Sequence, residues 1–143
     1  MSFDNISDDT VTLAAAADLS TKQYYAVKVD SSGNAAVAGA GDFAAGLLQN
    51  KPSAAGQPAT VAYGGVSKGF AGGTITAGNL VAADASGKLV AATKGKTDTS
   101  DTGAAADALI GSNVIGIALA SAVASDIFPV LLLIAGAVPT TAA

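Results

Sequence analysis

The triplet Asp101-Thr102-Gly103 matches the catalytic signature of aspartic proteases, and a protease of the dimeric kind needs only one per chain. That chemistry requires two aspartates that share a proton, each held at the end of an apolar strand. The segment before the triplet, residues 97–100, is Thr-Asp-Thr-Ser and entirely polar. The pattern therefore favours a solvated loop over a catalytic dyad.

Two other short motifs also lack the context that their chemistry needs. Gly95-Lys96-Thr97 matches the end of a phosphate-binding P-loop, but that motif requires a glycine where this chain has Val90. Ser67 and Lys68 are adjacent, so on a strand their side chains point to opposite faces and cannot form a nucleophile pair. A loop and an ordinary strand explain both motifs.

Three aspartates, Asp98, Asp101 and Asp107, lie close together and carry the oxygen ligands that calcium prefers. The EF-hand spacing, with ligands at alternate positions and a final glutamate, is absent. The sequence therefore predicts a solvated acidic loop and no metal site.

The amino-acid composition excludes most of the side chains that act in catalysis and metal binding. The chain has no His and no Cys, and its acids and bases are all Asp and Lys. It therefore lacks the side chain that titrates near neutrality, the usual ligands of zinc, copper and haem, and the guanidinium fork that binds phosphate. We expect a protein without enzymatic activity and without a cofactor.

The charge and hydropathy patterns bear on the partners. The formal net charge is −4 and the lysines are scattered, so we expect no binding to nucleic acid. The most apolar stretch, residues 127–138, contains Pro129 and is shorter than the roughly twenty residues of a membrane helix. It predicts a buried strand, and no membrane segment or signal peptide is expected. Its apolar part from Phe128 to Ile134 suggests more hydrophobic surface than one small domain needs.

Alternation and turn residues predict a mainly β fold, a compact barrel-like or sandwich-like domain built of hairpins. In residues 25–29, Tyr25, Val27 and Val29 alternate with smaller or charged residues, the period of a half-buried strand. Residues 30–34, Asp-Ser-Ser-Gly-Asn, form a turn, and residues 35–38 return as a second strand.

The second half of the chain repeats this order. Residues 80–92 match the first hairpin at an offset of 54 positions, and residues 116–131 match residues 46–61 at an offset of 70. The sequence thus predicts an internal duplication, with an insert at 93–112 that starts as a polar loop and has the option of a short helix. The predicted β domain spans 23–138, its halves are 23–72 and 73–138, and a tail follows at 139–143.

The N-terminal segment, residues 1–22, lacks this regularity. It is expected to be an extended arm that grips a partner, because isolated apolar residues stand among acidic and hydroxyl side chains. A frayed terminus is the alternative. The candidate anchors are Phe3, Ile6, Val11 and Leu13.

The assembled pattern resembles the capsid decoration, or cement, proteins of tailed bacteriophages. The similarity covers most of residues 24–134 and consists of turn and strand motifs. The matching segments are Tyr25-Ala-Val-Lys-Val-Asp-Ser-Ser-Gly-Asn34, Gly46-Leu-Leu-Gln49, Gly56-Gln-Pro-Ala-Thr-Val61, Gly64-Gly-Val66, Ile75-Thr-Ala-Gly-Asn-Leu-Val81, Asp84-Ala-Ser-Gly-Lys88, Val114-Ile-Gly-Ile-Ala-Leu-Ala120 and Asp126-Ile-Phe-Pro-Val-Leu-Leu132.

This resemblance implies a compact β protein, made in the host cytoplasm, that binds the major capsid protein on the outer surface of the virion and stabilises the shell. It also implies a homotrimer and an N-terminal arm laid over neighbouring capsid subunits. The insert at 93–112 departs from the family pattern. The alternatives are a fibre, spike or adhesion module, a tail subunit, and an enzyme.

Overall fold

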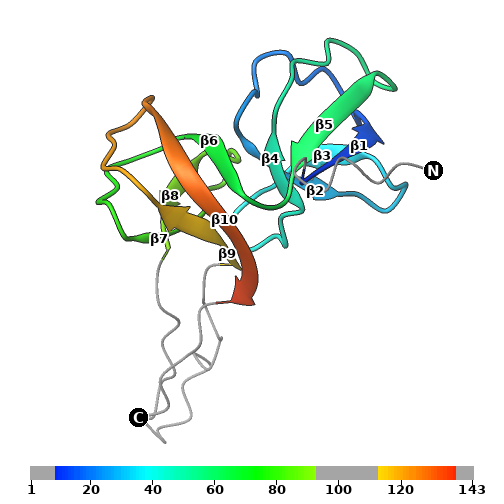
Figure 1. Ribbon diagram of the computed structural model, residues 1–143. Helices are drawn as coiled ribbons and strands as arrows, with labels where there is room; N and C mark the ends of the chain where they lie inside the picture. Colours follow the sequence, from blue (N-terminus) through cyan, green and yellow to red (C-terminus); the bar gives the residue numbers. More distant parts are fainter. Residues whose placement is uncertain (1–8, 93–112, 138–143) are drawn as a thin grey trace, which may run out of the picture.

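The protein is described by a computed structural model over residues 9–92 and 113–137, and this part is all-β. Ten strands form two five-stranded antiparallel sheets, which confirms the expected fold class. Figure 1 shows the sheets as two lobes side by side. The expected helix option at 93–112 and the tail at 139–143 lie outside the described residues. Within those residues, no helix is long and apolar enough to span a membrane.

The two sheets share one strand order. The first sheet runs β1-β5-β4-β2-β3 and the second runs β6-β10-β9-β7-β8, so each strand of the second takes the place of the strand five numbers earlier. The strands of the first sheet are β1 (Thr10–Ala14), β2 (Ala26–Val29), β3 (Ala35–Val37), β4 (Gly46–Leu48) and β5 (Pro58–Ala62). Those of the second are β6 (Val66–Phe70), β7 (Leu80–Ala83), β8 (Leu89–Ala91), β9 (Asn113–Ala118) and β10 (Ile127–Ala137).

The repeat extends to the register of the strands. Val27 pairs with Val37 as Val81 pairs with Ala91, at the expected offset of 54. The pair Leu48–Val61 recurs as Ala118–Val130, which places the closing strand at an offset of 69 instead of the expected 70. The loop before β10 is one residue shorter than the loop before β5, and this shortening explains the shift.

The division between the halves differs from the expected position at 72/73. Val66–Phe70 forms β6, which pairs with β10 of the second sheet. The structure therefore consists of a first lobe, residues 9–62, and a second lobe, residues 66–92 and 113–137, joined at Tyr63-Gly64-Gly65. Sequence comparison missed this because β1 and β6 share almost no residue types.

The expected arm is also shorter than predicted, because its later residues belong to the first sheet. Thr10–Ala14 forms β1, an edge strand that pairs with β5, and both Ala15 and Leu19 are buried. Threonine and valine are β-branched and favour strands. The pattern interpreted as isolated anchors is thus an edge strand from residue 10 onward.

Each lobe has an inner core on equivalent faces. In the first lobe it contains Val27, Leu48 and Val61, and in the second Val81, Ala118 and Val130 occupy the matching positions. Two glycines are required where the central strands cross close to their neighbours. A Cβ on Gly46 would overlap the carbonyl of Ala62, and one on Gly116 would overlap that of Leu131.

Candidate docking surface

A row of apolar side chains crosses the outer face of the second sheet, the face turned away from the core of its own lobe. Val66 pairs with Leu131, Leu131 with Ile117, and Ile117 with Leu80, on four neighbouring strands. Residues paired in this way project from the same face of a sheet. We call these four residues the second outer row.

Three of the four residues of the second outer row are exposed, and Ile117 is partly buried. Val66 is 64% exposed, Leu131 is 39% exposed and Leu80 is 37% exposed. Leu119, directly after β9, and Ile127 and Leu133 of β10 add three more exposed apolar side chains. Contiguous exposed apolar surface of this kind marks binding sites for other proteins.

The equivalent row of the first sheet is covered. Thr10, Ala62, Leu47 and Ala26 pair across it in the same register, and we call them the first outer row. Its last three members are buried and belong to the same core cluster as Val81 and Leu89 of the second lobe. The two lobes of the chain are therefore held together on the first outer row.

The turn at residues 84–88, between β7 and β8, forms one part of this lobe contact. The Gly87 carbonyl accepts a hydrogen bond of 2.8 Å from the Ala26 N–H. Gly87 has a φ of 83°, and a Cβ there would overlap Val37 of the first lobe. Glycine is needed on both grounds, because other residues disfavour this conformation and the lobes approach too closely for a side chain.

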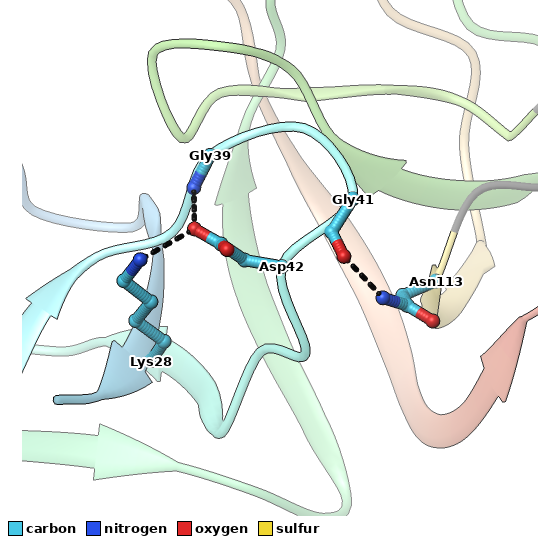
Figure 2. Close-up of polar contacts among 5 residues, drawn as sticks. All are labelled: Lys28, Gly39, Gly41, Asp42 and Asn113. Atoms are coloured by element: carbon cyan, nitrogen blue, oxygen red, sulfur yellow. Dashed lines mark hydrogen bonds and ion pairs between the residues drawn. The ribbon is translucent and has the colours of Figure 1, made fainter. Parts of the chain in front are cut away.

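A second part of the lobe contact is the polar loop after β3 (Figure 2). The Lys28 ammonium donates to Asp42 Oδ2 at 2.7 Å, and the Gly39 N–H donates to the same oxygen. Together they hold the pKa of the Asp42 carboxyl below its usual range. The Gly41 carbonyl of this loop accepts a bond of 2.9 Å from Asn113 of β9, so the ion pair supports a contact between lobes.

The sequence-predicted site residues fall in different places. Val11 lies on β1 with its side chain 40% exposed, whereas Leu13 is partly buried against the core of the first lobe. Phe3 and Ile6 lie outside the described residues. The aspartic triplet, the candidate calcium ligands and the Gly95-Lys96-Thr97 motif lie there as well.

Side chains able to do chemistry are not assembled in the described part of the chain. Ser67 is buried and accepts a hydrogen bond from Gln49, while the neighbouring Lys68 is exposed. An open hollow near Tyr24, Tyr25 and Phe70 has polar groups such as Gln23 and Lys51 but no carboxylate. Residues 9–92 and 113–137 hold no group of three acids that could bind a metal ion.

The second outer row was not predicted from the sequence. The pattern at 127–138 predicts a buried strand, yet among residues 127–134 only Phe128, Val130 and Leu132 are buried. The intervening residues Ile127, Leu131 and Leu133 are exposed. A strand that is apolar on both faces shows no alternation of apolar and polar residues in the sequence. Its buried face can then be told from its exposed face only when the packing of both faces is known.

The described residues thus define a class: an all-β protein of two tandem lobes, with exposed apolar side chains on the outer face of the second sheet. The fold is similar to a solved structure described as the head fiber gp8.5 N base in bacteriophage phi29, with a TM-score of 0.58 and 13% sequence identity. The match covers 89% of this chain and 95% of that chain. No protein-family model and no curated protein matches the sequence. At this identity the likeness shows a shared fold.

Proposed function

We propose that this chain is a structural protein of a tailed-phage virion that binds the outside of the capsid and stabilises the shell. The observation that carries the proposal is the shared fold with the head fiber base of phage phi29, which extends over nearly the whole of both chains. The decoration-protein motifs of the sequence support the same role independently of that fold.

The exposed surface of the described residues suits a protein that binds to a capsid. The described residues offer exposed apolar side chains and a free edge strand, β1, which pairs only with β5. Edge strands bind extended segments of a partner through main-chain hydrogen bonds. The proposed partner is the major capsid protein, and no enzymatic step is involved.

The proposal keeps Phe3 and Ile6 as capsid anchors, since Val11 and Leu13 are held in β1. It also includes a homotrimer, because contacts of modest strength add through effective concentration when copies are linked. The trimer and the capsid anchors come from the family resemblance and from the sequence pattern of the arm.

Co-sedimentation with undecorated capsids tests this function. The full chain is expected to pellet with the shells and to raise the temperature at which they break, while a variant lacking residues 2–8 keeps its fold and pellets more weakly. If the full chain stays in the supernatant at every concentration, the capsid-binding proposal fails. Equal binding of the truncated variant would assign capsid binding to the β lobes and would show that Phe3 and Ile6 are not capsid anchors.

The base of a head fibre is a second candidate, favoured by the description of the phi29 protein. Both candidates bind the capsid, and shell stability separates them. A decoration protein raises the disruption temperature of the shell, whereas a fibre base is expected to bind without changing it.

A further inference from the structure

We propose that a second copy of this chain covers the second outer row, and that it does so by repeating between copies the contact that joins the two lobes within one chain. The inference deepens the self-association included in the proposed function. It concerns purified protein, so it is tested without capsids.

The two outer rows differ in the size of their side chains. Positions held by Ala26, Leu47 and Ala62 in the covered row are held by Leu80, Ile117 and Leu131 in the open one. A sheet face that meets only water usually carries polar side chains. The open row is instead larger and equally apolar, as expected of a face that is covered in the assembled protein.

The first lobe carries a second copy of the turn that contacts it from the second lobe. The turn at residues 30–34 has the same construction as the turn at 84–88. In each, the aspartate that opens the turn accepts two backbone N–H bonds, and the glycine has a φ near 80° (81° for Gly33 and 83° for Gly87). Gly87 is buried against the first lobe, whereas a Cβ on Gly33 would meet open space. The first lobe therefore presents a free turn of matching shape.

One polar contact between the lobes involves two residues whose equivalents are exposed. Gln49 Nε2 donates to Ser67 Oγ at 2.9 Å, from the end of β4 to β6. The equivalents of these residues are Leu119, after β9, and Val11, on β1. Both are exposed apolar residues, 47% and 40% exposed. A repeated lobe contact would place Leu119 of one copy against Val11 of the next and bury both.

The two surfaces that meet in this contact are different from each other. Each copy offers the second outer row at one end and the 30–34 turn with Val11 at the other, so the interface is heterologous. Such contacts form a closed ring when the rotation between copies closes, and every copy then uses both surfaces.

Cross-linking of two single-cysteine variants tests the pairing, since the natural chain has no cysteine. Val11→Cys and Leu119→Cys are mixed and treated with a short bis-maleimide. The mixture is expected to give a covalent dimer, and each variant alone is not. The double variant Gln49→Cys with Ser67→Cys is the positive control, because the same contact then lies within one chain and yields a cross-linked monomer.

Sedimentation equilibrium supplies the second measurement. The natural chain is expected to have a mass at least twice the 13.6 kDa of one chain. The Leu119→Lys variant is expected to have the mass of the monomer. Val123→Lys is the matched control: Val123 is also exposed, but its equivalent, Ser53, is an exposed residue that bonds only within its own loop. That variant should keep the natural mass.

Three results would overturn the proposal. One is a mixture that gives no dimer while the positive control is cross-linked. Another is an oligomer whose mass is unchanged by Leu119→Lys. A chain that binds capsids as a monomer would also contradict the inference, and the homotrimer with it, while the proposed capsid binding would stand.

Discussion

The two sheets have the same strand order and the same pairing register, yet their outer rows have opposite surroundings. Leu47 is fully buried under the second lobe, while its equivalent Ile117 is only partly buried, in a row whose other three members are exposed. Nothing in the local strand geometry accounts for the difference, because both residues occupy the same place in the same topology. The comparison shows that the same face can have different surroundings in two copies of one fold. The first outer row joins the two lobes, whereas the second outer row remains accessible to a partner.

Lysine substitutions at these two equivalent positions should change the free energy of unfolding by very different amounts. The loss at Leu47 is the largest effect expected. Leu47→Lys places an ammonium group in the buried lobe contact, with an expected loss of several kcal/mol in the free energy of unfolding. Ile117→Lys should cost about 1 kcal/mol or less in the isolated chain, because the long side chain can reach water from the exposed row. Denaturant unfolding at low protein concentration, where self-association does not contribute, measures both.

Similar losses for the two variants would mean that the second outer row is as much a part of the folded core as the first. The contrast drawn between the sheets would then be wrong. A small loss for Leu47→Lys would instead show that the lobes separate easily.

A smaller effect is expected from the ion pair that supports the loop at residues 39–42. The pKa of Asp42 is held low by Lys28 and by the Gly39 N–H, so the charged carboxylate is favoured in the folded state. Its stabilising contribution is present above the unfolded pKa of about 3.9. It is lost as the pH falls through the lower pKa of the folded protein.

Thermal unfolding of the natural chain and of Asp42→Asn at pH 7 and at pH 3 measures this contribution. The variant should melt at a lower temperature at pH 7, and the gap should narrow toward pH 3. The effect is small, because both side chains are partly exposed and such pairs contribute little. A gap that stays constant with pH would show that the carboxylate charge is not what supports the loop.

Much of the fold could be predicted from the sequence, because turn residues and alternation fix hairpins locally. The Asp30 and Asp84 turns and the strands that flank them could be predicted from the pattern, and the repeated order of these segments indicated the duplication. Strand β1 was missed, since a short run of threonine and valine becomes a strand only when β5 lies beside it. Its pairing depends on residues about fifty positions away, which no local pattern encodes.

The candidate site was less predictable than the fold. Exposure of Leu131 depends on which lobe covers which face, and that is a property of the packing of the two lobes. The sequence did indicate a surplus of apolar residues near the end of the chain, and self-association stays a prediction. It did not show that alternate residues of one strand divide between the core and a binding surface.

A cryo-EM reconstruction of capsids incubated with the full chain tests the account most directly. The predicted result is density for the tandem lobes on the outside of the shell, with the second outer row in contact with the 30–34 turn of a neighbouring copy. Shells without added density would contradict capsid binding. Bound lobes whose Leu131 row faces solvent would contradict the role assigned to the second sheet.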